Sequence, residues 1–184
     1  MEVFASIIAA VAISAFTFIL EDVIRNFAAG LFIKKEKRFV AGNIISVEGI
    51  GELQIIEVGM MSTLAVDTQN GLYTAINNSD LLKTTVRNYS RTEWYYVSAE
   101  IAMPGNTDMP ALEGALLGIA DELEWAVFGR EPKIEIVRFE EGGLVVDIKV
   151  AVKPTRPRHE WESMLRKALQ RGLLSAGFST GANS

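Results

Sequence analysis

Val3 to Leu20 reads VFASIIAAVAISAFTFIL, eighteen residues without a charged side chain. A helix of this length covers about 27 Å at roughly 1.5 Å per residue, close to the hydrocarbon thickness of a bilayer. The run therefore predicts a transmembrane helix. Two alternatives remain, a buried helix of a soluble protein and a signal peptide. Ala10-Val11-Ala12 imitates a cleavage site, but Glu2 stands where a signal peptide carries a basic residue.

A second helix of different character follows without a turn. Glu21 to Leu31 (EDVIRNFAAGL) places apolar residues at helical spacing, which predicts an amphipathic helix. Its apolar positions are Val23, Ile24, Phe27, Ala28 and Leu31. A basic cluster comes next, formed by Lys34, Lys35, Lys37 and Arg38. Because basic residues favour the inner side of a membrane, we expect the C-terminal part of the chain to be cytoplasmic.

Small residues follow two faces of the predicted span. One face holds Ser6, Ala10, Ser14 and Thr17, the other Ala5, Ala9 and Ala12, and a larger ridge holds Phe4, Ile8, Val11 and Phe18. Small faces allow close helix packing in a membrane, whereas chance alanines on a lipid-facing helix are the simpler explanation. We interpret the pattern as copies of this helix packed around an axis, and so as an oligomer.

Composition excludes several classes of function. The 184-residue chain has a net charge of −5, which argues against nucleic acid as a partner. It has no cysteine, which excludes disulfides and thiolate chemistry, and His159 is its single histidine, so one subunit cannot form a triad or a multi-histidine metal site. We expect no cofactor, no metal and no catalytic residue.

The periodicity changes to that of strands from Phe39. Short runs rich in branched residues occupy Ile44–Glu48, Gly51–Val58, Ser62–Asp67 and Leu72–Ile76. They predict a small antiparallel β-barrel of about 50 residues, which pairing with neighbouring copies would help to stabilise. Asn70-Gly71 predicts a two-residue hairpin turn. We interpret the polar segments 78–82 and 86–91 as a connection between domains.

The last part of the chain predicts strands and helices in the order βαββα, a ferredoxin-like α+β sandwich. The strands are expected at Trp94–Ala102, Lys133–Phe139 and Leu144–Val152, and the helices at Met109–Phe128 and Pro157–Ala176. Asp108 is expected to cap the first helix, and the last two strands to flank a hairpin at residues 140–143. The chain is thus predicted as an α+β membrane protein with three parts, residues 1–38, 39–91 and 92–184.

Residues that could carry chemistry have simpler explanations. His159 lies beside the start of a helix, and Lys153, Arg156 and Arg158 fit a solvated turn, although an anion or a lipid head group could sit there. The carboxylates of Glu140-Glu141 and Asp121-Glu122-Glu124 lack a nearby nucleophile. Gly49-Ile50-Gly51 lacks the third glycine of a dinucleotide fingerprint. An enzyme is therefore not expected.

Four segments together resemble the small-conductance mechanosensitive ion channel family. They are NFAAGLFI (Asn26–Ile33), FVAGNIISVEGIGELQIIEVGMMST (Phe39–Thr63), INNSDLL (Ile76–Leu82) and NYSR (Asn88–Arg91). The resemblance covers residues 20–91 by motif and the remainder by the order of elements. It implies a homoheptameric channel of the plasma or inner membrane, opened by tension under osmotic stress. It also implies a pore helix, an Sm-like β-domain and a cytoplasmic vestibule with side portals, passed by ions and small solutes and surrounded by lipid.

Aligning Asn26 and the Ala28-Ala29-Gly30 run carries the family's roles over to individual residues. Ser14 and Phe18 fall where similar channels present two bulky aliphatic rings as a hydrophobic seal. Because serine rings would admit water, the seal rests on Phe18 alone, or on Val11 and Phe18 together. The resemblance also implies that three residues pack the amphipathic helix: Asn26, Phe27 and Gly30.

Several features depart from the family's pattern. Glu21-Asp22 replaces a helix-breaking glycine at the helix junction, and rings of these carboxylates at the pore mouth would attract cations. Arg38 and Asn77 stand where the family favours proline, which predicts looser turns. Family members also carry at least two more membrane helices before the pore helix. They usually end with an additional strand. The missing membrane helices and Ser14 favour an alternative function, a non-conducting membrane-anchored oligomeric scaffold or sensor.

Overall fold

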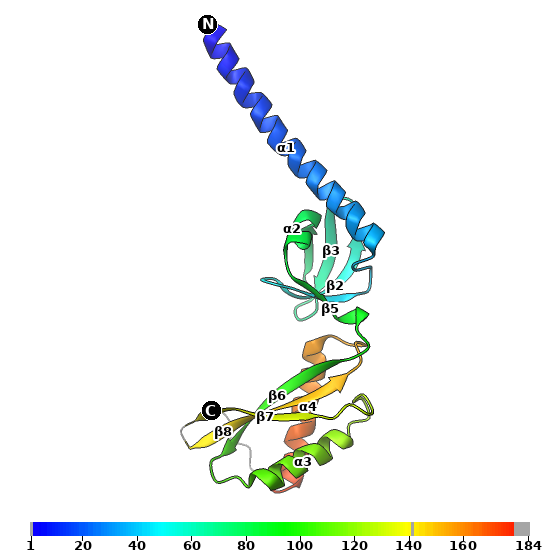
Figure 1. Cartoon of the computed structure of the whole chain (residues 1–184), viewed down its shortest axis with the longest axis vertical. Helices are drawn as coiled ribbons and strands as arrows, with labels where there is room; N and C mark the ends of the chain where they lie inside the picture. The colour runs from blue at the N-terminus through cyan, green and yellow to red at the C-terminus, as the bar shows by residue number, and fades with distance from the viewer. Residues whose placement is uncertain (1, 141, 179–184) are drawn as a thin grey trace. The chain divides into compact units, whose positions relative to one another are not determined.

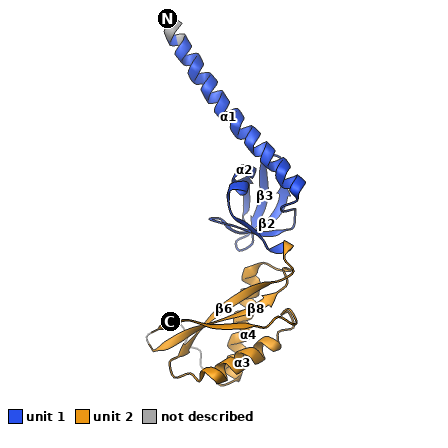
Figure 2. Cartoon of the chain, viewed as in Figure 1, with its two compact units in different colours: residues 1–90 blue, residues 91–184 orange. Residues whose placement is uncertain are grey.

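The computed structural model describes residues 2–140 and 142–178, and it divides into two compact units (Figure 2). We call residues 1–90 the N-terminal unit and residues 91–184 the α+β unit. Glu141, in the expected hairpin, lies outside the described residues. Each unit has its own apolar core.

The N-terminal unit begins with one continuous helix, α1 (Glu2–Glu36), which contains both predicted helices (Figure 1). The helix ends in a Schellman motif, because the Arg38 N–H donates to the Ile33 carbonyl at 3.3 Å and the Lys37 N–H to the Lys34 carbonyl at 3.3 Å. Lys37 occupies the left-handed position of this motif with φ of 47°, where glycine is the usual residue. The two helices of different character are thus joined with no break.

Five antiparallel strands follow α1, in the order β4-β3-β2-β1-β5. They are β1 (Ile44–Val47), β2 (Gly51–Val58), β3 (Ser62–Asp67), β4 (Tyr73–Asn77) and β5 (Val86–Asn88), with α2 (Asn78–Lys83) between β4 and β5. Inward residues of β2 and β3 alternate with outward ones. The core they form also takes in Ile33 of α1 and Leu81 of α2. Four predicted strands are therefore confirmed.

The polar connection expected at residues 78–82 and 86–91 is wrong for most of its length. Residues 78–83 form α2, whose Leu81 is buried, and β5 pairs with β1 through Val47 and Val86. A 3₁₀ turn, η1 (Tyr89–Arg91), then leads to the α+β unit. These elements are too short and too polar to show a periodicity, and long-range contacts stabilise them instead.

The two-residue hairpin expected at Asn70-Gly71 is also wrong. Residues 68–72 form a longer loop, in which the Asp67 carboxylate accepts hydrogen bonds from the N–H groups of Gln69 at 2.8 Å and Asn70 at 3.2 Å. This side-chain turn keeps Asn70 out of the left-handed region, which Gly71 enters with φ of 74°. Asp67 therefore sets the loop geometry.

The α+β unit has the predicted βαββα order. It contains β6 (Tyr95–Pro104), α3 (Met109–Asp121), β7 (Lys133–Glu140), β8 (Gly143–Val152) and α4 (Arg158–Ser175). The strands are antiparallel in the order β6-β8-β7, which is the order of the first three strands of a ferredoxin-like sheet. Both helices bury their apolar faces in one core with β6 and β8. The ferredoxin-like α+β prediction is confirmed.

Helix α3 is shorter than the predicted Met109–Phe128. Its start is as expected, because the Asp108 carboxylate accepts from the Ala111 N–H at 3.4 Å. It ends at Asp121, because the chain then turns back to the sheet: the Val127 N–H donates to the Ala151 carbonyl at 2.9 Å, and Ala126 bridges to Val152. The apolar spacing of Leu123 and Val127 imitates a helix, but sheet pairing decides the backbone there.

Candidate functional site

The first half of α1 is an apolar surface without cover in the single chain. Among the described side chains, Phe4, Val11, Ile13, Phe16 and Phe18 are 65% to 73% exposed. The helix from Ser6 to Glu36 contains an 18-residue window with a mean hydropathy of 2.2, and it is long and apolar enough to cross a membrane. Since monomers in water rarely expose so large an apolar surface, this segment requires lipid or further copies of the chain around it.

The residues expected to form the gate lie in one helix at spacings of three and four. Val11, Ser14 and Phe18 therefore share one stripe of α1. The Ser14 hydroxyl donates to the Ala10 carbonyl at 2.9 Å, so its proton is bonded within the helix. Val11 and Phe18 remain as the large apolar side chains of this stripe, exposed at 65% and 72%.

A charged group follows the stripe at the junction of the two helix halves. Arg25 forms ion pairs with Glu21 and, at 3.8 Å, with Asp22. All three side chains are exposed, so the pairs add little stability. Their effect is on charge, because each copy carries two carboxylates and one guanidinium here. The sequence hypothesis considered Glu21 and Asp22 only, although the spacing of Arg25 from Glu21 could have shown the pair.

The first testable prediction concerns this charge. If copies of α1 line a pore, as the resemblance implies, Arg25→Gln leaves Glu21 and Asp22 unpaired and is expected to shift the reversal potential in a salt gradient toward the cation equilibrium potential. Glu21→Gln with Asp22→Asn is expected to shift it the opposite way. Arg171→Gln, which removes an arginine from α4 instead, serves as the control. Equal reversal potentials in all these variants would show that the junction does not face the permeation path.

The second half of α1 contacts the rest of the N-terminal unit through Asn26. This side chain is 8% exposed, and its Oδ1 accepts the Ser79 N–H of α2 at 3.0 Å. Its Nδ2 donates to the Asp22 carbonyl at 3.0 Å. Asn77, the residue preceding α2, makes no side-chain capping bond, so Asn26 caps α2 from another helix.

Asn78 continues the polar contact into the sheet. It is fully buried, and its Oδ1 accepts from the Thr63 hydroxyl at 2.8 Å while its Nδ2 donates to the Gly59 carbonyl at 3.2 Å. Thr63 is also fully buried. We call Asn26, Ser79, Asn78, Thr63 and Gly59 the polar clip. Its buried polar groups are paired with one another, which specifies one seating of α1 on the sheet.

Gly30 closely approaches the loop between β2 and β3 and the side chain of Asn78. A Cβ atom built on it would lie 2.4 Å from the Met60 carbonyl oxygen and 2.6 Å from Asn78 Nδ2. Both distances are far below van der Waals contact, so this position requires glycine. The buried face of the helix comprises Asn26, Ala29, Gly30 and Ile33. The apolar positions predicted earlier, with Phe27 among them, remain exposed beside this face.

A family profile matches the segment just described. The profile is that of the mechanosensitive ion channel beta-domain, and it matches residues 22–91. Residues 22–91 match a mechanosensitive ion channel beta-domain. The resemblance stated from the sequence is thereby confirmed, and the Asn26 and Gly30 contacts lie within this β-domain segment.

Solved structures extend the likeness to the fold of the whole chain. The crystal structure of Helicobacter pylori MscS in the closed state matches with a TM-score of 0.81 at 18% identity, over 98% of this chain and 70% of that one. Arabidopsis thaliana MSL1, determined by cryo-electron microscopy, matches with a TM-score of 0.70 at 18% identity, over 96% and 65%. The chain thus spans about two thirds of these proteins. Comparison with curated protein sequences found no match.

Outside the mechanosensitive-channel segment, the described residues hold no cluster of His, Cys, Asp or Glu suited to a metal ion. Arg156 and Arg158 pair with Glu160 at 3.3 Å and Glu162 at 2.7 Å, as residues of a solvated helix start do. His159 lies in the first turn of α4.

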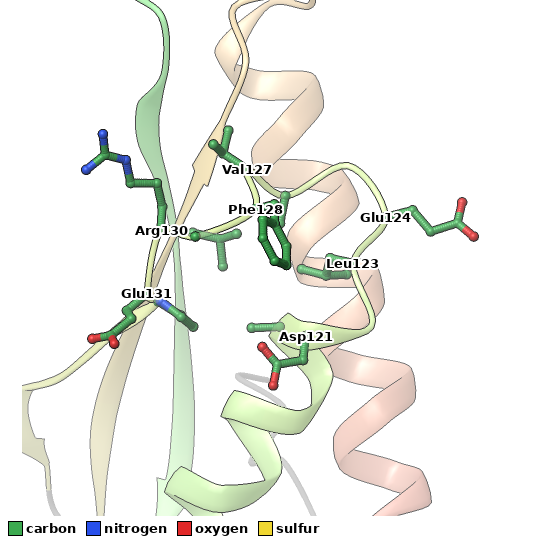
Figure 3. A pocket seen from close by; sticks show the side chains of 12 residues that line it. Asp121, Leu123, Glu124, Val127, Phe128, Arg130 and Glu131 are labelled. Carbon is green, nitrogen blue, oxygen red and sulfur yellow. The ribbon is translucent and has the colours of Figure 1, made fainter.

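A hollow of about 470 Å³ lies at the end of α3, where the loop that carries Phe128 folds back to the sheet (Figure 3). Asp121, Glu124 and Arg130 line it beside apolar residues. Its carboxylates include two of those considered from the sequence. The lining contains carboxylates but no histidine, serine or threonine, so it offers no hydroxyl nucleophile beside them.

The second testable prediction concerns the polar clip. Asn26→Ala is expected to leave the buried Ser79 N–H unpaired and to cost about 1–3 kcal/mol of local stability. Hydrogen–deuterium exchange of the α2 amides would report the loss as faster exchange. Asn26→Asp keeps the acceptor oxygen at a helix N-terminus and should restore most of the protection. Unchanged exchange in Asn26→Ala would contradict the capping role.

Proposed function

We propose that this chain forms the pore and cytoplasmic vestibule of a tension-gated ion channel, a homo-oligomer that releases ions and small solutes during hypoosmotic stress. The observation that carries the proposal is the bare apolar half of α1, which continues without a break into a mechanosensitive-channel β-domain. A membrane anchor alone would not need that rigid continuity with a folded domain.

The pore is proposed to form where copies of α1 meet around an axis. Small residues such as Ala9, Ala10 and Ser14 allow close helix packing, while Val11 and Phe18 narrow the axis. Seven copies, the family's number, would supply the ring. Membrane tension favours the state with the larger in-plane area, so it would shift the population toward an open ring.

The polar clip is proposed to carry the change from α1 to the β-domain. Asn26 and Gly30 bind the second half of the helix to α2 and to the loop between β2 and β3. The exposed apolar residues beside them, Val23, Ile24, Phe27 and Leu31, would face neighbouring copies or the inner leaflet. The basic cluster near the end of α1 supports a cytoplasmic position for the remainder of the chain.

Patch-clamp recording of the purified chain in liposomes tests this function. Unitary currents whose open probability rises with suction are the expected result. Native mass spectrometry of the same preparation would establish the number of subunits. An intact oligomer that gives silent patches would reject conduction by this chain and favour the scaffold or sensor alternative, whereas a monomer would reject the assembly itself.

A further inference from the structure

Asp147 is a buried carboxylate on the helix-free face of the α+β unit. It lies in the middle of β8, the central strand, where its neighbours Val146 and Ile148 point into the core. Strand alternation therefore directs Asp147 to the opposite face, together with Lys149. Although no helix of this unit covers that face, Asp147 is only 8% exposed. The side chains of the flanking strands must therefore shield it.

Two more carboxylates lie in register with Asp147. Glu100 of β6 is its cross-strand partner on one side, and Glu135 of β7 is its partner on the other. We call Glu100, Asp147 and Glu135 the carboxylate row. Directly opposed side chains have Cβ atoms about 4.5–5.5 Å apart, and like charges in such pairs are destabilising. The buried Asp147 thus lies between the exposed Glu100 and Glu135.

The basic side chains around the carboxylate row pair mainly with its two outer members, Glu100 and Glu135. Arg138 of β7 binds Glu100 at 2.8 Å, and also Glu140 at 2.8 Å, while Lys149 binds Glu135 at 2.6 Å. Lys149 reaches Asp147 Oδ2 only at 3.8 Å. Asp147 Oδ1 is buried and has no hydrogen-bond partner in the described chain. Lys133 lies on β7 opposite Lys149, beyond the row.

A buried carboxylate oxygen without a donor disfavours the ionised form. Burial raises the pKa of Asp147 above its ordinary value of 3.8; Lys149 opposes the rise, and the charges of Glu100 and Glu135 add to it. The hydrogen bond and charge of Lys149 lower the pKa of Glu135 below 4.5. Neighbouring carboxylates on one sheet thus respond to acid in opposite ways.

We propose that Asp147 is a proton-binding switch of the three-stranded sheet, at which uptake of one proton removes the central charge of the carboxylate row and stabilises the α+β unit. A protonated Asp147 offers a hydroxyl donor and no longer repels Glu100 and Glu135. The switch belongs to this unit and does not depend on conduction by α1.

The pH dependence follows from which state holds the proton more tightly. The folded chain binds a proton at Asp147 more strongly than the unfolded chain, so stability is gained as the pH falls through the folded pKa and is complete below 3.8. Glu135 has the opposite sign: its contribution is present above 4.5 and is lost as the pH falls through its lowered pKa. The two effects together give a stability maximum in mild acid.

Tryptophan fluorescence can measure the pH-dependent stability of the α+β unit in the full chain. Trp94, Trp125 and Trp161 are all of its tryptophans, and all lie in the α+β unit. Urea unfolding of the detergent-solubilised chain, followed by tryptophan fluorescence, therefore reports this unit alone. As the pH falls from neutral through the folded pKa of Asp147 toward 3.8, the unfolding equilibrium constant is expected to fall, up to about tenfold for each unit by which that folded pKa exceeds 3.8.

Asp147→Asn is expected to abolish this rise in stability, whereas Asp121→Asn, an exposed substitution at the end of α3, should retain it. A wild-type midpoint that only falls on acidification, or a rise that persists in Asp147→Asn, would overturn the proposal. If Asp147→Asn does not fold, carbon-13 NMR of the wild-type Asp147 carboxyl decides. Titration above 3.8 supports the switch, and titration at or below 3.8 rejects it.

Discussion

Phe18→Ser is expected to produce a channel that leaks at zero tension. The substitution removes an aromatic side chain, exposed at 72% in the single chain, from every copy around the proposed axis. Burying a phenylalanine is worth about 1.5–3 kcal/mol, and each 1.4 kcal/mol changes an equilibrium about tenfold. Since the loss is repeated in each copy and serine holds water in the constriction, resting open probability should rise more than about tenfold.

Phe16→Ser provides a matched control for this gate. Phe16 is exposed at 67%, nearly as much as Phe18, but lies two residues away and therefore on another face of α1. Phe16→Ser removes the same phenyl ring from the same helix and leaves the proposed constriction unchanged. Unitary recordings at rest should show closed Phe16→Ser channels and open Phe18→Ser channels. Closed channels in both variants would exclude Phe18 as the gate.

Gly30→Ala should detach α1 from the β-domain. The new methyl group would meet the Met60 carbonyl and the Asn78 amide at 2.4 Å and 2.6 Å, and the first of these is backbone that must move. Overpacking and disruption of the polar clip outweigh the better helix propensity of alanine, for a net loss of about 2–4 kcal/mol. Amide exchange over residues 26–33 and 78–83 should then accelerate roughly 30-fold to several hundred-fold.

The same substitution in α3 has a different environment. Gly118 has open space where a Cβ would be, so Gly118→Ala should leave the structure intact and stabilise its helix by about 0.5–1 kcal/mol. Amide hydrogen exchange of α3 in Gly118→Ala is the control. Equal exchange of the α1 and α2 amides in wild type and Gly30→Ala would show that the close approach does not hold the helix.

Most regular elements could be predicted from local patterns. The uncharged run before Glu21 and the alternation in β2 and β3 each repeat over enough residues to indicate their structure. The short elements could not be predicted in this way. Helix α2 has six residues and takes its cap from Asn26, more than fifty positions earlier in the chain. No local signal reveals such a contact.

The residues of the candidate site also differ in how far the sequence could predict them. The family resemblance places Ser14 and Phe18 at the proposed gate, with Val11 as the alternative to Ser14, and this role stays a prediction. Their spacing along α1 puts all three on one stripe. For the face that seats α1, the family resemblance pointed to Asn26, Phe27 and Gly30. Asn26 and Gly30 make the close contacts and Phe27 is exposed, and hydrophobicity alone does not reveal that asparagine and glycine make them. The carboxylate row depends on the register of three strands, which a sequence does not show by itself.

The seating of α1 also has a mechanical consequence. Its buried face, from Asn26 to Ile33, extends about 10 Å along the helix axis. A force along that axis loads the contacts in shear, so they resist together and must yield together. A sideways force on the apolar end instead peels them one at a time, beginning at Asn26. The helix is therefore a stiff connection to axial pulling and a compliant lever to lateral displacement.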